Sequence, residues 1–308
     1  MERHEAPRPG QGEIPALPAA WVSVLLAIVI GTAACAALVL LPGFARGDGF
    51  SGERLVRADR RLAASPEDPG AYWQRADLRR ETGDFLGALA DLGRAAELAP
   101  GSLTTAILRA QVYLDSGQAL AALEVLGPAA RNEESLAEVQ RLRAESLLRL
   151  DLPAAAAEAF STAIDARPGA GPSLYLARAR AQVEVGAEAL PAALAGLDGG
   201  IAEMGPVPGL VREAIEIEIS LGHVDHALER ISRASGESRR RGTWLEWRGQ
   251  ILEKADRPGE ALEAYQDAMD ELLETPSRTR SSSAMQALEG RLGQSIAKLS
   301  GASEEEGD

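Results

Sequence analysis

The chain has 308 residues, a formal net charge of −14, 45% apolar residues and only 4% aromatic residues. A balance this acidic argues against general nucleic-acid binding, which needs a basic surface to neutralise phosphates. The single cysteine, Cys35, excludes an intrachain disulfide and a cysteine-rich metal site. No stretch alternates between apolar and polar residues at period two, so we expect an all-α fold whose core is built from alanine and leucine.

The N-terminal part of the sequence contains two contrasting stretches. Residues 1–20 are polar and include four prolines, which predicts a disordered N-terminal tail. Residues 21–41 then contain no charged side chain. As a helix rising about 1.5 Å per residue, this stretch would match a hydrocarbon core about 30 Å thick. We therefore expect a transmembrane helix, or uncleaved signal anchor, over residues 21–42.

Two alternatives to this anchor remain open. Gly43 and Ala45 form a small-x-small cleavage pattern, which favours a cleaved signal peptide, although the apolar run exceeds the usual length of about 7–15 residues. A buried helix of a soluble fold is the second alternative. More arginines follow the span than precede it, which by count alone favours a cytoplasmic domain, but large domains translocate largely regardless of charge. We expect the following domain to be periplasmic or extracytoplasmic.

A short linker separates this apolar stretch from the rest of the chain. Residues 43–52 are rich in glycine and predict that linker, with Ser51 as the N-cap of the next helix. Residues 53–64 then carry apolar side chains at helical spacing, which predicts a leading helix that covers the first end of the following domain. The apolar positions of that helix are Leu55, Ala58 and Leu62.

From Pro69 onward, small residues recur every 34 positions. The three series are Ala76, Ala110 and Ala144; Ala88, Ala122 and Ala156; and Ala95, Ala129 and Ala163. Gly83 and Gly117 keep the same step and are expected in turns between helices. A fixed period of this length indicates stacked helical hairpins, in which a small side chain at each crossing lets two helices approach closely. One hairpin cannot bury its apolar face alone, so neighbouring hairpins must share a core.

The spacing of small, aromatic and turn residues in the first hairpin resembles that of the tetratricopeptide repeat (TPR) family, and the resemblance covers roughly residues 52–270. The residues that match the family pattern are Tyr72, Ala76, Gly83, Ala88, Leu92, Ala95 and Pro100. The resemblance implies an all-α fold, a right-handed superhelical solenoid of TPR helix hairpins, here preceded by one transmembrane helix. We expect this solenoid over residues 53–274, with about six repeats.

The later repeats depart from the pattern in one place. The fourth repeat is degenerate, because residues 188–208 include extra positions and four glycines, which predicts a bend or a loosened join. Pro153 and Pro258 are expected at the start of second helices, where a missing N–H costs little. A C-terminal capping helix is expected over 284–299, followed by an acidic disordered tail over 300–308.

The sequence carries no constellation that indicates catalysis. His223 and His226 have the spacing of two metal ligands, but no third ligand stands near them in the sequence. Neither the phosphate-binding loop pattern nor the nucleophile elbow of hydrolases is present. We therefore expect a protein that is not an enzyme and that needs no cofactor or metal.

The family resemblance implies that the first helix of each hairpin, the A helix, lines a concave wall that binds partners. The wall positions expected here are Trp73, Asp77, Arg80, Ile107, Gln111, Leu114, Arg141, Glu145, Leu148, Arg180, Arg212, Glu216, Glu246 and Gln250. Trp73 is either an exposed peptide anchor or a residue packed under the leading helix. Some family members clamp a terminal carboxylate with Lys and Asn, where this chain has Trp73 and Asp77. Trp244 and Trp247 are expected to pack against the final helix.

These features predict a membrane-anchored scaffold that binds partner polypeptides in the concave TPR groove and helps to assemble a membrane or envelope complex. A secreted or periplasmic chaperone-like holdase is one alternative, and a regulatory subunit of an envelope enzyme is another. The expected partners are proteins or peptides, and the lipid bilayer through the N-terminal helix. Nucleic acid and small-molecule substrates are not expected.

Overall fold

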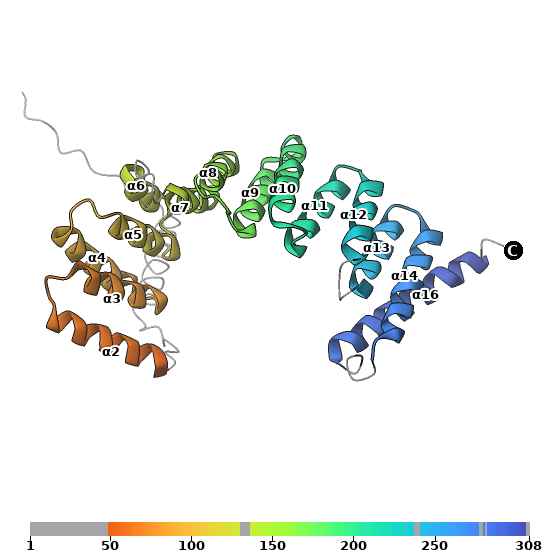
Figure 1. Ribbon diagram of the computed structural model, residues 1–308, viewed down its shortest axis with the longest axis horizontal. Coiled ribbons are helices and arrows are strands. Elements are labelled where there is room, and N and C mark those ends of the chain that lie inside the picture. The colour runs from red at the N-terminus through yellow and green to blue at the C-terminus, as the bar shows by residue number, and fades with distance from the viewer. Residues whose placement is uncertain (1–48, 130–135, 237–240, 277–279, 281, 306–308) are drawn as a thin grey trace, which may run out of the picture. The chain divides into compact units, whose positions relative to one another are not determined.

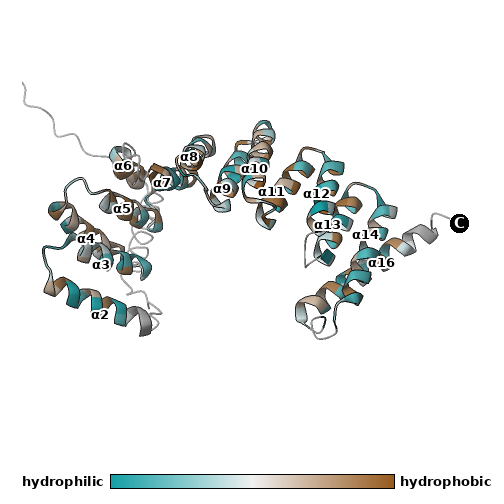
Figure 2. Ribbon diagram, viewed as in Figure 1, coloured by the Kyte–Doolittle hydropathy of each residue, from teal (hydrophilic) through white to brown (hydrophobic). Residues whose placement is uncertain are grey.

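The computed structural model describes residues 49–129, 136–236, 241–276, 280 and 282–305. The predicted tail over 1–20 and the predicted transmembrane helix over 21–42 lie outside these ranges. Within them the regular structure is helical, without β strands, which confirms the all-α prediction for the described part. Apolar and polar residues are mixed along the described helices (Figure 2), and none of these helices combines the length and apolar character needed to cross a membrane.

The described ranges contain fourteen α-helices and one short 3-10 helix (Figure 1). They are α2 (Gly49–Ala64), α3 (Pro69–Glu81), α4 (Phe85–Leu98), α5 (Leu103–Asp115), α6 (Ala119–Ala129), α7 (Leu136–Arg149), α8 (Pro153–Asp165), α9 (Pro172–Val185), η2 (Ala187–Ala189), α10 (Leu190–Met204), α11 (Pro208–Ser220), α12 (Val224–Gly236), α13 (Arg241–Lys254), α14 (Pro258–Glu274) and α16 (Ser283–Glu305).

The helices pack as six consecutive hairpins. Helices α3 and α4, α5 and α6, α7 and α8, α9 and α10, α11 and α12, and α13 and α14 contact each other within these pairs. The second helix of each hairpin, the B helix, also contacts the A helix of the next one, and α14 contacts α16. Each hairpin therefore shares its core with its neighbours, which confirms the predicted TPR-like stacking. The right-handed superhelix stays a prediction.

The recurring alanines lie where the predicted register requires them. Ala76, Ala110 and Ala144 on A helices have no exposed surface, and neither do Ala88 and Ala122 on the B helices that follow. A methyl group is the largest side chain that lets two helix backbones approach this closely. The 34-residue period therefore reflects the close crossing of the two helices in successive hairpins.

The turns inside five of the six hairpins share one backbone conformation, and the turn of the fourth differs, with Gly186 at a φ of 133°. Gly83, Gly117 and Gly222 have φ angles of 82°, 78° and 77°, and Asp151 and Asp256 take the same place with 59° and 57°. In each of these five turns the amide of the following residue bonds back to a carbonyl five positions earlier, which is the usual left-handed ending of a helix. Aspartate is one of the few other residues that tolerate this conformation.

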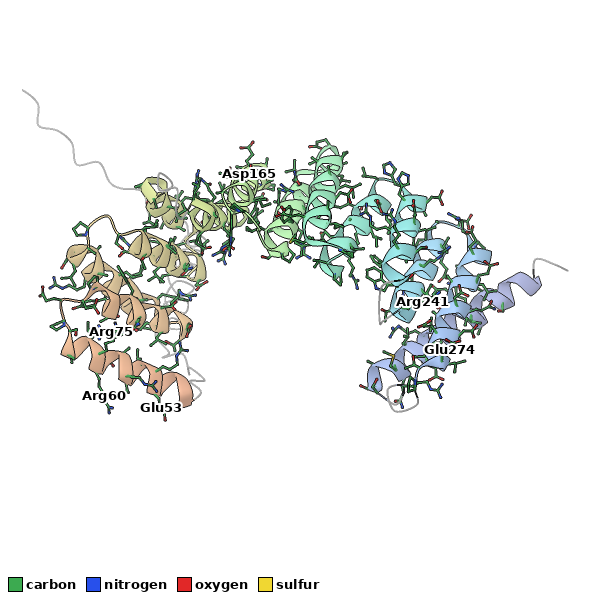
Figure 3. The ribbon with its side chains drawn as sticks, viewed as in Figure 1. Glu53, Arg60, Arg75, Asp165, Arg241 and Glu274 are labelled. Atoms are coloured by element: carbon green, nitrogen blue, oxygen red, sulfur yellow. The ribbon has the colours of Figure 1, made fainter. Side chains whose placement is uncertain are left out.

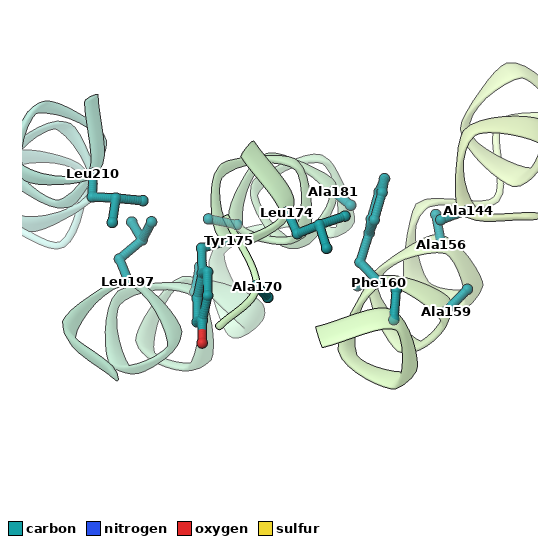
Figure 4. Packing of buried hydrophobic residues seen from close by; sticks show 14 of the residues in the cluster. Ala144, Ala156, Ala159, Phe160, Ala170, Leu174, Tyr175, Ala181, Leu197 and Leu210 are labelled. Atoms are coloured by element: carbon teal, nitrogen blue, oxygen red, sulfur yellow. The ribbon is translucent and has the colours of Figure 1, made fainter. Parts of the chain in front are cut away.

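The fourth hairpin differs from the expectation of a loosened join. Helix α10 runs unbroken from Leu190 to Met204 despite its glycines. A Cβ atom added at Gly200 would lie 2.8 Å from the Tyr175 ring, and one added at Gly196 would lie 2.4 Å from the Arg178 guanidinium. The glycines therefore provide space for large side chains of α9. One continuous apolar cluster, part of which is shown in Figure 4, extends through this hairpin into α11.

Two predicted boundaries are wrong. The leading helix α2 begins at Gly49, so Ser51 lies inside the helix and the linker predicted over 43–52 ends earlier. Helix α16 continues to Glu305, beyond the end that was predicted at residue 299. Both errors occur where a terminal helical turn is polar or glycine-rich, so that no apolar periodicity marks it.

Candidate partner-binding groove

Trp73, the predicted peptide anchor, is partly buried inside the first two hairpins. Its indole Nε1 donates a hydrogen bond to Thr105 Oγ1 over 2.9 Å, and its side chain packs against the buried cluster that contains Leu92 and Val112. The hydrogen bond joins α3 to the start of α5. A side chain held by both of these contacts is not a free anchor.

Four charged residues of the predicted wall are paired within the first three hairpins. Arg80 lies 2.7 Å from both Asp77 and Asp115, and so connects α3 to α5. Arg141 binds Glu138 at 2.6 Å and also contacts Glu145. The Arg141 guanidinium holds the pKa of Glu138 below its usual value. These pairs satisfy one another and leave little unpaired charge for a partner.

The remaining wall positions of these hairpins are largely apolar. Leu114 is only 2% exposed and belongs to the core of the second hairpin, so its assignment to the wall surface is wrong. Ile107 and Leu148 are partly buried against neighbouring core clusters, while Gln111 is partly exposed. An A-helix position that faces both the wall and the next hairpin is covered when that neighbour packs closely.

Two further predicted residues take part in contacts between elements. Arg180 on α9 pairs with Glu213 on α11 over 3.0 Å. Glu246 on α13 is 8% exposed, and both of its carboxylate oxygens accept hydrogen bonds from Arg291 of α16, over 2.6 and 2.9 Å. Its carboxylate is therefore paired within the protein and is not available to a partner. The sequence gives no sign of this pair, because its members lie 45 positions apart.

The wall is hollowed between α11 and α13, where a cavity of about 450 Å³ opens. This volume falls within the range of ordinary ligand sites. Helix α13 begins at Arg241, which is labelled in Figure 3. Residues of α11, of the first turn of α12 and of the C-terminal half of α13 line the cavity. They are Glu216, Ile219, Val224, Trp247, Gln250, Ile251, Lys254 and Ala255.

A second cavity of about 330 Å³ adjoins the first and shares Trp247 and Gln250 with it. Arg212, Thr243, Trp244 and Glu246 complete its lining. The Arg212 guanidinium carbon lies 4.9 Å from the centre of the Trp247 ring, a distance typical of a cation–π contact. We call these two joined cavities the α11–α13 groove.

Four polar side chains of this groove differ from the charged wall residues of the first hairpins in lacking a hydrogen bond or ion pair to the described residues. Within the described ranges, the side chains of Arg212, Glu216, Gln250 and Lys254 make neither a hydrogen bond nor an ion pair. By contrast, Arg230 on the neighbouring helix α12 binds both Glu218 and Asp198. A bound polypeptide can form hydrogen bonds and ion pairs with such polar groups while its apolar side chains contact the neighbouring apolar residues.

Three predicted wall residues therefore line the groove with free side chains, namely Arg212, Glu216 and Gln250. Trp247 and Lys254 were missed. Trp244 and Trp247 pack against the cluster that contains Leu288 and Leu292 of the final helix, and the Trp247 ring also lies beside Arg212 of α11. A signal was present in the sequence, because Trp247, Gln250 and Lys254 follow one another at spacings of three and four, which places them on one helix face.

The sequence matches no protein-family model, and it matches no curated protein. Solved structures are similar to it at low identity. A tetratricopeptide repeat protein from Parabacteroides merdae is 16% identical, with 77% of this chain and 89% of that chain covered and a TM-score of 0.46. The C-terminal part of a TPR repeat-containing protein from Cytophaga hutchinsonii is 11% identical, with 81% and 90% covered and a TM-score of 0.49. Yeast Tom70 is 16% identical, with 76% of this chain and 45% of the Tom70 chain covered and a TM-score of 0.47.

Proposed function

We propose that this protein is an interaction scaffold that binds a segment of a partner polypeptide in the α11–α13 groove. The observation that carries the proposal is the set of free side chains there. Arg212, Glu216, Gln250 and Lys254 line the two cavities and make neither a hydrogen bond nor an ion pair with the described residues. Groups of this kind supply hydrogen bonds and charge pairs to an extended segment, while Trp247 supplies contact area. No chemical step belongs to this function.

The proposal includes an anchor. A membrane helix over residues 21–42 would hold the groove close to the bilayer and raise its effective concentration towards membrane-bound partners. The uncharged run of residues 21–41 supports this part. With that anchor, the protein assembles a membrane or envelope complex from the extracytoplasmic side.

Photo-crosslinking in the native host tests the groove. A photoreactive amino acid at Gln250 is expected to give discrete partner adducts, because this side chain lines both cavities. The matched control is Gln266, an exposed glutamine of the B helix α14, where such adducts should be missing. Trp247→Ala should remove the adducts formed at Gln250. Equal adducts at both glutamines would refute the groove as the binding site.

Membrane fractionation tests the anchor separately. The full chain with an intact N-terminus should sediment with membranes and resist extraction by carbonate. A chain that starts at residue 43 should be released. Recovery of the intact full chain in the soluble fraction would contradict the anchor without affecting the groove.

A further inference from the structure

The charges around the α11–α13 groove leave one cation uncompensated. Glu216 and Lys254 line the larger cavity with opposite charges. In the smaller cavity, Glu246 is neutralised by its two hydrogen bonds to Arg291. Arg212 has no acidic partner among the described residues. Because Arg291, which lies outside the lining of both cavities, compensates Glu246, the remaining charged side chains of the groove are Arg212, Lys254 and Glu216, with one more positive than negative charge, although the net charge of the whole chain is −14.

The position of Arg212 suits it to receive a carboxylate. Its guanidinium carbon lies 4.9 Å from the centre of the Trp247 ring, so the indole covers one side of the group. The N–H groups of a guanidinium lie in its plane and point outward from its edge. No described residue pairs with the N–H groups of Arg212, so they remain available for a paired interaction with two oxygen atoms. Such charge-assisted pairs are about twice as strong as neutral hydrogen bonds.

The neighbouring cavity suits an apolar side chain. Ile219, Val224 and Ile251 line it together with one face of Trp247. The two cavities share Trp247 and Gln250, so one bound segment can reach both. The free amide of Gln250 stands between them and can pair with the backbone of that segment.

We propose that the occupant of the groove is an extended peptide segment with an aliphatic or aromatic side chain in the larger cavity and a carboxylate on Arg212. This inference rests on the proposed function and adds the chemistry of the partner. The carboxylate is supplied either by an aspartate or glutamate side chain or by the end of the partner chain. Charge complementarity with Arg212 favours an acidic segment over a basic one.

Selection from a library of random dodecapeptides on the full-length, detergent-solubilised protein tests this inference. Enriched peptides should combine an apolar residue with an acidic group a few positions away. Arg212→Gln should weaken their binding about tenfold, because one charge-assisted pair is lost. Arg233→Gln is the matched control, since Arg233 is an exposed arginine of α12 that lies outside both cavities. Enriched peptides without acidic groups, or equal loss in both variants, would overturn the proposal.

Synthetic versions of the best peptide identify the source of the carboxylate. An amidated C-terminus should abolish the effect of Arg212→Gln if the chain end binds, and Glu→Gln or Asp→Asn within the peptide should abolish it if a side chain binds. An effect that survives both changes would refute the role of Arg212.

The two proposals fail in different ways. Partner adducts at Gln250 together with selected peptides that lack acidic groups would overturn the partner chemistry alone. Loss of the adducts together with a selection that enriches no peptide would overturn both the groove and its chemistry.

Discussion

At the scale of single residues, the core of the last hairpin depends on the match between a glycine and a tyrosine. Gly249 occupies the A-helix position that alanine fills in the first three hairpins, and a Cβ atom there would lie 2.5 Å from the Tyr265 ring. Tyr265 is 1% exposed, and its hydroxyl donates a hydrogen bond to Glu253 over 2.6 Å. Because the ring is held at both ends, it has no room to move aside.

Gly249→Ala should therefore destabilise the protein, although alanine is the better helix former. We expect a loss of about 1–3 kcal/mol in the free energy of unfolding from overpacking. The control is Gly293→Ala in the exposed part of α16, where an added Cβ meets nothing within 4 Å. That variant should gain up to about 1 kcal/mol. Urea unfolding measures both, and shifts in the same direction would contradict the packing argument.

The pair of Glu253 and Lys298 predicts a dependence of stability on pH. Lys298 and then the Tyr265 hydroxyl lower the pKa of Glu253, so the ionised form is favoured in the folded state. A depressed folded pKa contributes stability that is present above the unfolded value of about 4.3 and is lost as the pH falls through the folded value. Glu253→Gln should make the unfolding free energy less dependent on pH below about 4.3 than it is in the parent. An unchanged slope in acid titrations would contradict this role.

At the scale of helices, an ion pair joins the A and B helices of two hairpins with its charges exchanged. Arg79 and Asp91 lie 2.8 Å apart in the first hairpin, and Asp91 also binds Arg75, which is labelled in Figure 3. Glu218 and Arg230 lie 2.7 Å apart at the corresponding positions of the fifth hairpin. The two arrangements show that an ion pair at this crossing can have either direction.

Asp91→Asn tests how much the buried pair contributes. The side chain of Asp91 is 4% exposed, so the substitution removes the buried carboxylate from two partly buried guanidinium groups and leaves Arg75 and Arg79 only the exposed carboxylates of Asp59 and Asp84. We expect a loss of about 3 kcal/mol in the free energy of unfolding. Glu97→Gln removes an exposed pair with Arg94 and should cost less than about 1 kcal/mol. Thermal unfolding of both variants decides the point, and equal losses would refute the assignment.

At the scale of the whole molecule, each hairpin depends on its neighbours, and α16 takes the place of a neighbour at one end. Leu288 and Leu292 of α16 are 3% and 0% exposed, and they belong to the same cluster as Leu252 and Tyr265. Arg291 and Lys298 bind Glu246 and Glu253 of α13. Helix α16 thus covers the apolar face that the last hairpin would otherwise expose.

Leu292→Ala should destabilise this end more than the rest. We expect a loss of about 2–5 kcal/mol from the cavity created, with faster amide hydrogen exchange in α13 and α14 than in α3 and α4. Leu273→Ala is the matched control, because Leu273 is 51% exposed, and it should leave the exchange nearly unchanged. A uniform increase in exchange along the chain would contradict coupling between nearest neighbours.

The sequence by itself determined the helical hairpins and their order. The alanine series, the turn residues and the helix-starting prolines each act over a few positions of the chain, so their meaning does not depend on distant contacts. Gly200 misled the sequence reasoning because its role is to admit the Tyr175 ring from a different helix. Local propensity registers only the loss of helix stability at such a glycine.

Only the tertiary structure decided which wall residues are available to a partner. Arg80, Arg212 and Glu246 are equally polar in the sequence, yet Arg80 is paired, Glu246 is buried under α16, and Arg212 is free. These outcomes depend on side chains that arrive from other hairpins, 35 positions away for Arg80 and 45 for Glu246. Repeat spacing determines which way a side chain faces. Whether that side chain finds an opposite charge, or is covered by another helix, is decided only when the hairpins stack.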